Sequence, residues 1–373
     1  MLGVLKELKS RVQVSRGSQD RVSVDTVVSA LHHRVTSAIL LVCCTLVSSR
    51  QYFGDPILCI QSGPGDDPTI PTHVLNTYCF VSSSYTVVGH SGETWQGHGS
   101  AERRHAYYQW VPFVLFVQAL LFASPHAAWR NWEGGLVRGS LTGLRDDVRG
   151  PGRDKLRTLA RYFTARLHTF RIWATGFYVC QLLNLLNVVA NVFLTDQILG
   201  GNFYHYGLKM SQYGLEILET SPAETVFPKV TKCMFRKYGP SGTIQNHDAL
   251  CVMALNVVNE KIFMALWLWF AFLALVSALS LLWRLTILGL LACTSVHSRS
   301  FVSVWAQRVL GAPVTLEPTY LSPVTQSLDC GDWLFLQLLA ANMGSRVYRD
   351  FMEQLVQAME QVRPSDLRPI WNS

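Results

Sequence analysis

Long apolar runs separated by polar stretches are the strongest pattern in this sequence. Segments 107–129 and 172–195 contain no charged side chain, and segment 261–283 contains one, at its first position. A helix needs about 20 apolar residues to cross the hydrocarbon layer of a membrane. Segment 31–52 has a shorter apolar centre and reaches that length if the arginine near its start extends its charge to the interface. The pattern therefore predicts four membrane-spanning helices.

The charges between these segments indicate how the chain is oriented in the membrane. Loop 130–171 holds ten basic and four acidic side chains, and residues 1–34 hold six and three. By contrast, residues 51–106 hold two basic and five acidic side chains, and residues 195–261 hold six of each. Basic residues are retained on the cytoplasmic side. We therefore expect three cytoplasmic parts, which are 1–30, 130–171 and 284–373. The two extracellular loops are then 53–106 and 196–260.

The composition supports a membrane protein and excludes several other classes. Hydrophobic residues make up 49% of the 373 residues and charged residues 15%, compared with about 25% charged residues in soluble domains. These values exclude a disordered regulator and a fibrous repeat. The net charge of +7 comes largely from loop 130–171. It therefore reflects membrane topology, and we expect no nucleic-acid partner.

Four of the nine cysteines fall in the two expected extracellular loops. Cys59 and Cys79 lie in the first loop, and Cys233 and Cys251 in the second. Disulfides form in such an oxidising space, and four cysteines allow three pairings. Bridges between the loops would each stabilise the fold by roughly 3–5 kcal/mol, because they close long chain loops. A zinc site is the alternative, but neither loop has the short cysteine pair typical of metal binding.

Several strings of residues, taken in order along the chain, resemble one protein family. They are Arg50-Gln51-Tyr52-Phe53-Gly54-Asp55-Pro56, Tyr107-Tyr108-Gln109-Trp110 and Val226-Phe227-Pro228-Lys229. From about Leu31 to Trp283, and again at Gly331-Asp332-Trp333, the chain resembles the innexins, the invertebrate gap-junction channel proteins. Divergent innexins also occur in viruses of parasitoid wasps, so an animal and a viral source both stay open.

The resemblance implies an all-α integral membrane protein: a bundle of four transmembrane helices with two disulfide-braced extracellular loops and a helical cytoplasmic cap. It implies the disulfides Cys59–Cys251 and Cys79–Cys233. It also implies an octameric hemichannel in the plasma membrane, homomeric or built with other innexin subunits, which docks with a hemichannel of the adjacent cell at a gap junction. Ions and small metabolites would pass through it. Leu58 is a departure, because the family usually has an Asp before this cysteine.

Two segments are candidates for the inner mouth of the pore. Residues 1–12 have an amphipathic helical pattern, and the resemblance places Met1, Leu2 and Leu5 in a funnel at the pore mouth. The residues alone leave a position on the inner leaflet equally open. The other candidates begin the first span, where we favour solvated interface side chains over a pH sensor, and they are His32, His33 and Arg34.

The third span carries one polar stripe, and the second span carries two prolines. The stripe residues fall within about 120° of one another on a helix, and they are Gln181, Asn184, Asn187 and Asn191. Because unpaired amides are costly in hydrocarbon, we favour hydrogen bonds to neighbouring helices over pore lining. Pro112 and Pro125 each remove a backbone donor, and we favour a static bend there over a gating hinge.

The C-terminal region divides into two parts. Residues 295–327 are rich in Ser, Thr and Pro and predict a linker. Apolar positions between Asp332 and Met359 recur at helical spacing, with an interruption at Gly344-Ser345 and an end near Pro364. The pattern predicts two helices, and the innexin resemblance implies that they pack with helices of loop 130–171.

The remaining function classes fit the sequence less well. We find no catalytic constellation and no metal-spaced His pair, so we expect no enzyme, no cofactor and no bound metal. A non-conducting four-span adhesion protein of the claudin kind is the main alternative, but claudins have short second loops. Connexins share the topology but usually carry three cysteines in each outer loop, whereas this chain has two in each.

Overall fold

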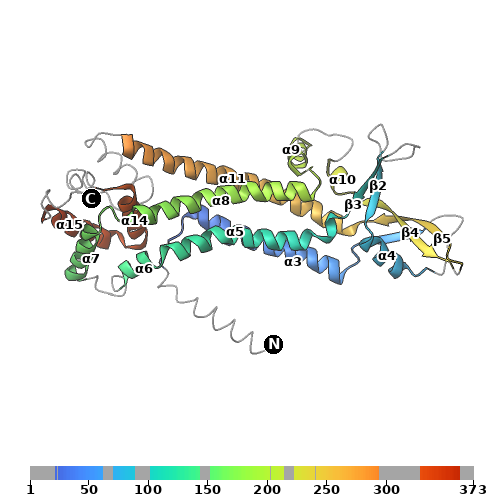
Figure 1. Cartoon of the computed structure of the whole chain (residues 1–373), viewed down its shortest axis with the longest axis horizontal. Coiled ribbons are helices and arrows are strands. Elements are labelled where there is room, and N and C mark those ends of the chain that lie inside the picture. The colour runs from blue at the N-terminus through green and yellow to red at the C-terminus, as the bar shows by residue number, and fades with distance from the viewer. Residues whose placement is uncertain are drawn as a thin grey trace, which may run out of the picture. The chain divides into compact units, whose positions relative to one another are not determined.

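The computed structural model describes residues 22, 24–61, 70–88, 101–142, 152–201, 203–213, 222–239, 241–293 and 328–361 (Figure 1). These residues form two compact units. The first contains the described residues up to Ser29, Pro125–Leu182 and those after Leu279, and the second contains Ala30–Ser124 and Leu183–Ala278. The N-terminal segment 1–12 and the linker 295–327 lie outside the described residues.

Four helices are long and apolar enough to cross a membrane, as the hydrophobic pattern predicts. The first candidate span, Val27–Phe53, consists of α2 (Val27–Ala30), the π-helix η1 (Leu31–Thr36) and α3 (Ser37–Phe53). The other three helices are α5 (Val111–Glu133), α8 (Phe170–Ile198) and α11 (Ala254–Cys293), of which Ala254–Gly289 is the candidate span. The prediction of four spans is confirmed.

The prolines of the second span have different structural settings. Tyr107–Gln109 form the short 3₁₀-helix η2, so the α-helix begins at Val111 rather than at the expected Tyr107. Pro112 is then in the first turn, where a backbone N–H has no partner within the helix anyway. Pro125 lies inside α5, so only this proline interrupts the helical hydrogen-bond pattern.

The segments expected to be loops contain a five-stranded antiparallel sheet. Its strands are β1 (Leu58–Gln61), β2 (Ser84–Val88), β3 (Ala101–His105), β4 (Val230–Tyr238) and β5 (Ile244–Val252), in the order β1-β5-β4-β2-β3. Helix α4 (Thr72–Val81) lies beside β1 and β4 (Figure 1). The chain is mostly helical, as expected, but the sheet is an addition that the sequence analysis did not assign.

The β4–β5 hairpin is the longest strand pair of this sheet. Its register runs from Val230 opposite Val252 to Tyr238 opposite Ile244. At the end of the hairpin, the Gly239 N–H donates to the Thr243 carbonyl over 2.9 Å. Burial alternates along β4, so one face of the strand packs on the core while the other faces outward.

Short helices complete each unit. In the second unit, α9 (Phe203–Tyr213) and α10 (Pro222–Val226) precede β4. In the first unit, α6 (Leu136–Leu141), α7 (Arg153–Ala165), α14 (Cys330–Asn342) and α15 (Ser345–Gln361) pack around one apolar core. We call these four helices the helical cap. The two tail helices and their break at Gly344 match the sequence pattern.

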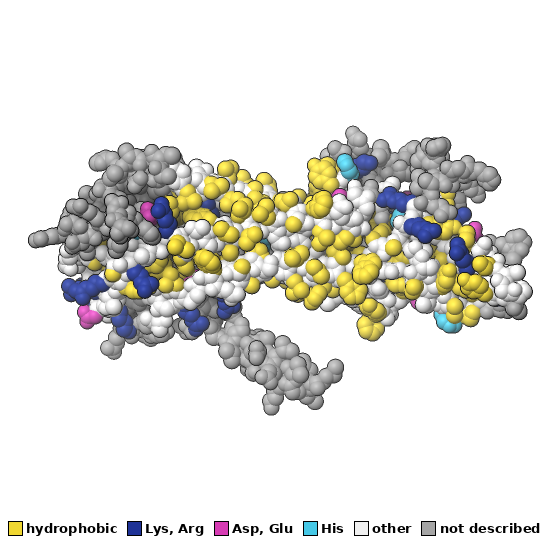
Figure 2. All heavy atoms as spheres, in the orientation of Figure 1, with side chains coloured by type: hydrophobic (Ala, Val, Ile, Leu, Met, Phe, Trp, Pro, Cys, Tyr) yellow, Lys and Arg dark blue, Asp and Glu magenta, His cyan; other side chains and the backbone are white. Residues whose placement is uncertain are grey.

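The surfaces of the long helices are apolar. On the face shown in Figure 2, hydrophobic side chains predominate along these helices, and charged side chains are sparse there. Helix α5 exposes Phe113, Phe116 and Leu120, and α11 exposes Phe272, Leu275 and Leu279. Such large exposed apolar surfaces are typical of helices that contact lipid or neighbouring subunits.

Candidate functional site

Two disulfides join elements that lie far apart in the chain. Cys59 of β1 bonds Cys251 of β5, 192 residues later, and Cys79 of α4 bonds Cys233 of β4, 154 residues later. Cys59 and Cys251 also stand opposite each other in the strand register, with their Cα atoms 4.0 Å apart. This is the pairing that the innexin resemblance implies. The sulfur atoms that a zinc site would require are therefore bonded to one another.

The signature residues at the start of the second span hold the end of α4. The last carbonyl groups of a helix have no partner within it, and here the Phe80 carbonyl accepts from the Tyr108 hydroxyl at 3.1 Å and from Gln109 Nε2 at 2.6 Å. Gln109 Nε2 also donates to the Val81 carbonyl at 3.2 Å. Burial raises the pKa of Tyr108, so its hydroxyl stays protonated and able to donate at neutral pH.

The other two residues of this string, Tyr107 and Trp110, make no hydrogen bond to the end of α4 among those described. The Tyr107 ring meets Phe227 edge-on, with centroids 5.8 Å apart, and Phe227 stacks on Phe263 of α11 at 5.6 Å. Trp110 is 62% exposed and lies next to Phe113. Tyr107 therefore belongs to the aromatic core beneath the sheet, whereas Trp110 is a surface residue at the first turn of α5.

Backbone contacts attach the sheet to the start of α11. The Met253 N–H donates to the Lys229 carbonyl at 2.8 Å. Asn256 Nδ2 donates to the Pro228 carbonyl at 2.8 Å, and Asn256 is fully buried. The segment before β4, which carries the string Val226-Phe227-Pro228-Lys229, is thus fixed to the helix that follows β5.

The pore-mouth candidates do not share one environment. Met1, Leu2 and Leu5 lie outside the described residues. Arg34 is exposed, and its Nε donates to His33 Nε2 at 3.1 Å.

His32 differs from the expectation of a solvated interface side chain, because it is fully buried. Its Nε2 lies 2.7 Å from Ser277 Oγ of α11. Ser277 Oγ donates to the Leu273 carbonyl at 2.7 Å, so the imidazole Nε2–H is the donor to Ser277. His32 is therefore a packing residue between helices, and the expectation that its side chain is solvated was wrong. Its place at the pore mouth stays a prediction.

The π-helix η1 contains one other buried polar residue, Thr36. Thr36 Oγ1 donates to the Leu31 carbonyl at 2.9 Å and accepts from Trp269 Nε1 of α11 at 2.9 Å. His32 and Thr36 therefore both bond α11, the first through Ser277 and the second through Trp269. The sequence pattern alone, read at 3.6 residues per turn, does not reveal a π-helix.

Part of the polar stripe of the third span bonds to the second span. Asn187 Nδ2 donates to the Leu121 carbonyl of α5 at 3.0 Å, and Asn191 Nδ2 donates to Asn187 Oδ1 at 3.0 Å. Thr195 Oγ1 donates to the Asn191 carbonyl at 2.8 Å and accepts from Gln118 Nε2 of α5 at 2.8 Å. Asn187 and Asn191 thus belong to a polar ladder between α5 and α8.

Two ladder residues were missed in the sequence, and two stripe residues lie apart from the ladder. Thr195 continues the stripe four residues after Asn191, and Gln118 is the only side-chain amide in α5 before Pro125. Both residues could therefore have been recognised in the sequence as polar partners. Gln181 and Asn184 are buried on α8, and neither takes part in the ladder bonds.

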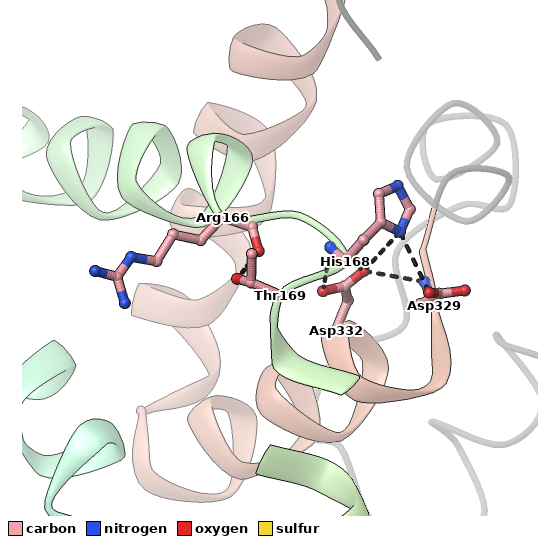
Figure 3. A network of polar contacts seen from close by, with 5 residues as sticks. All are labelled: Arg166, His168, Thr169, Asp329 and Asp332. Atoms are coloured by element: carbon pink, nitrogen blue, oxygen red, sulfur yellow. Dashed lines mark hydrogen bonds and ion pairs between the residues drawn. The ribbon is translucent and has the colours of Figure 1, made fainter. Parts of the chain in front are cut away.

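A second polar network lies in the helical cap (Figure 3). Asp329 is the N-cap of α14, and Asp332 completes a capping box by accepting the Asp329 N–H at 3.0 Å. The backbone N–H of His168, in the turn between α7 and α8, donates to Asp332 Oδ1 at 3.1 Å. His168 Nδ1 lies 3.5 Å from Asp329 and 3.6 Å from Asp332. The network fixes the start of α14 to this turn.

The same junction explains the Gly331-Asp332-Trp333 string. A Cβ on Gly331 would lie 2.5 Å from the carbonyl carbon of Phe170, so only glycine allows this approach of α14 to α8. Asp332 is fully buried, and burial raises the pKa of its carboxyl above the usual value, which its N–H donors and His168 offset only in part. Each residue of the string therefore has a structural role at this contact, Trp333 by packing on Ile287.

Comparison with known proteins assigns the family. A family model described as Innexin matches residues 25–359. The chain belongs to the innexin family. It is 38% identical over 353 residues to Innexin inx3 of Drosophila melanogaster, covering 90% of this chain and 85% of that protein. It is 36% identical to Innexin inx2 of Schistocerca americana, covering 91% and 95%, and 33% identical to Innexin shaking-B of Drosophila melanogaster, covering 95% and 94%.

This innexin is a gap-junction channel subunit. Its family is one of channel proteins and not of enzymes. The four candidate spans, the disulfide-braced sheet and the helical cap are the parts of that subunit.

Proposed function

We propose that eight copies of this innexin form a hemichannel in the plasma membrane, which docks with a hemichannel of the adjacent cell and passes ions and small metabolites between them. The observation that carries the proposal is the braced sheet. It is built from two chain segments held by two disulfides, and rigid ends lose little ordering entropy when two such ends meet.

The proposed orientation places the sheet outside the cell and the helical cap, with both termini and loop 130–171, inside. Two observations support it. Disulfides form in oxidising compartments, and all four bonded cysteines are in or beside the sheet, whereas Cys180 and Cys330 of the first unit are free thiols. The basic side chains of loop 130–171 favour the cytoplasmic side.

The tip of the β4–β5 hairpin is a proposed docking surface. Tyr238 and Ile244 stand opposite each other at the end of the hairpin and are 71% and 55% exposed. An exposed aromatic and aliphatic pair on a braced strand is suited to burial against another protein. Leu58, where the family usually has an acid, is also exposed, but it pairs with Val252 at the other end of β5, away from this tip.

For the pore, we propose that Met1, Leu2 and Leu5 form the inner funnel together with Arg34. The exposure of Arg34 supports its access to water or to lipid headgroups. The buried position of His32 and the ladder bonds of Asn187 and Asn191 support packing roles for those residues rather than contact with permeant ions.

Paired-cell electrical recording tests the channel proposal. The full chain is expressed alone in two cells that lack other innexins, and the expected result is a junctional current together with transfer of a small fluorescent dye. Cells that adhere without current or dye transfer would instead support the non-conducting adhesion protein. Imaging of purified rings checks the subunit number, and a ring of any number other than eight would refute the octamer.

A further inference from the structure

The carbonyl of Leu121 is left without its helical partner by Pro125. In an α-helix the N–H of residue 125 would donate to the carbonyl of residue 121. Pro125 lies inside α5 and has no N–H, and its ring also pushes against that carbonyl. Leu121 is in a candidate membrane span, where water cannot replace a lost hydrogen bond. The Leu121 carbonyl therefore requires another donor.

Two side chains supply donors to this carbonyl, from different helices. Ser124 Oγ of α5 donates to it at 2.9 Å, and Asn187 Nδ2 of α8 donates at 3.0 Å. A carbonyl oxygen has two lone pairs and can accept both. The Ser124 bond stays within α5, whereas the Asn187 bond joins the Leu121 carbonyl of α5 to the neighbouring helix α8.

The amide of Asn187 is held in the orientation that this bond requires. Asn191 Nδ2 donates to Asn187 Oδ1 at 3.0 Å, which directs the Asn187 NH₂ group toward α5. The ladder continues through Thr195 to Gln118, three residues before Leu121 in α5. Helix α8 therefore holds α5 at two points, Gln118 and Leu121, and both lie on the N-terminal side of Pro125.

We propose that Asn187 is the positioning residue of α5 at Pro125: its side chain replaces the hydrogen bond that Pro125 removes and so stabilises the helix turn around the proline. The consequence for gating that is tested below rests on the proposed channel function.

A double-mutant cycle in the full-length protein, reconstituted in lipid, tests the proposal. Pro125→Ala restores the N–H for Leu121, so Asn187 should matter only while Pro125 is present. We expect Asn187→Ala to increase backbone hydrogen exchange in residues 126–129 by about five- to tenfold, the size expected for one hydrogen bond. In the Pro125→Ala background the same substitution should change exchange by less than about twofold.

Two controls keep the result interpretable. Asn187→Leu retains a similar side-chain volume but has no donor, so it should reproduce the increase even if alanine leaves a packing defect. Asn131→Ala removes an exposed amide from the same helix α5 and should leave exchange unchanged. An equal effect of Asn187→Ala with and without Pro125 would overturn the proposal, because Asn187 would then stabilise the helix pair independently of the proline.

Electrical recording separates this inference from the channel proposal. If the wild-type chain conducts, Asn187→Ala should alter open probability without changing unitary conductance, and Pro125→Ala should cancel that difference. If the wild-type chain gives no current, the proposed function fails, whereas the exchange cycle still decides the role of Asn187. Normal gating of Asn187→Ala together with wild-type exchange would refute the positioning role.

Discussion

In the five-stranded sheet, two covalent bonds join segments 192 and 154 residues apart, whereas the helical cap is joined by stacked rings, aliphatic side chains and capping hydrogen bonds. The cap core contains a three-ring stack, with Phe170 and Phe335 4.5 Å apart and Phe163 next to both. Its helix α15 has one apolar face that packs on α7.

The difference follows from how much apolar surface each region can bury. Strands β4 and β5 expose alternate side chains and have only short partners at β1 and β2, so the sheet has a thin core, and small thin-cored regions commonly depend on disulfides. Amphipathic helices bury a continuous stripe and need no covalent bond. The sheet should therefore be sensitive to cysteine loss, and the cap to loss of packing.

The largest effect is expected from breaking a disulfide. Cys59→Ser or Cys233→Ser should abolish cell-to-cell coupling, because removal of a native disulfide costs roughly 2–5 kcal/mol and loosens the sheet that carries the docking surface. Junctional conductance is measured beside surface labelling, since a misfolded subunit would also fail to couple. Cys43→Ala, which changes a free half-buried thiol, is the control. A Cys59→Ser protein that reaches the surface and couples cells normally would contradict the docking role.

A large effect of a different kind is expected in the cap. Phe335 is fully buried in the ring stack, so Phe335→Ala should destabilise the cap by about 3–5 kcal/mol. The measurement is protease sensitivity of the cap and the unfolding temperature of purified protein, with exposed Glu353→Ala as the control. Disulfides and docking should persist in any variant that assembles. Loss of the sheet disulfides in this variant would show that the two regions are not independent.

A smaller effect tests the contact between α14 and α8. Gly331→Ala places a methyl group 2.5 Å from the Phe170 carbonyl carbon and should destabilise the cap by about 1–3 kcal/mol through overpacking. Gly344→Ala is the matched control, because nothing lies within 4 Å of its Cβ position. The two unfolding temperatures are compared directly, and equal values would show that the helices separate without cost.

The smallest expected effect is a pH dependence of the stability of the cap. The disulfide bonds of the sheet make no such contribution, because bonded cysteines do not titrate. Burial raises the pKa of Asp332, so the folded cap favours the protonated acid more than the unfolded chain does. This contribution is fully present below the unfolded pKa and is lost as pH rises through the folded pKa. Acidification from neutral pH toward the ordinary Asp pKa of about 4 should therefore raise the unfolding temperature of the wild type relative to Asp332→Asn.

Titration of both proteins over this range, with His168→Gln in each background, isolates the carboxyl from the neighbouring imidazole. A difference between wild type and Asp332→Asn that shrinks on acidification would contradict the assigned direction.

The sequence by itself determined the elements that depend on composition and short-range pattern. Long apolar runs marked the four long helices, although the first reached spanning length only by including Arg34, and the helical spacing after Asp332 marked α14 and α15 with their break at Gly344. The family strings added the disulfide pairing, which the spacing of the cysteines left open among three choices.

Tertiary structure alone decided which residues meet across long separations. The strand β1 pairs with β5 through residues more than 180 positions apart, and no local signal encodes that register. His32 is buried against Ser277 of α11, although its position next to a polar segment indicated exposure. A helical stripe shows which side chains share a face, but a hydrogen bond also needs a partner at the right height on another helix. Asn187 has one because Pro125 leaves the Leu121 carbonyl free beside it, and that partner exists only once α5 and α8 are packed.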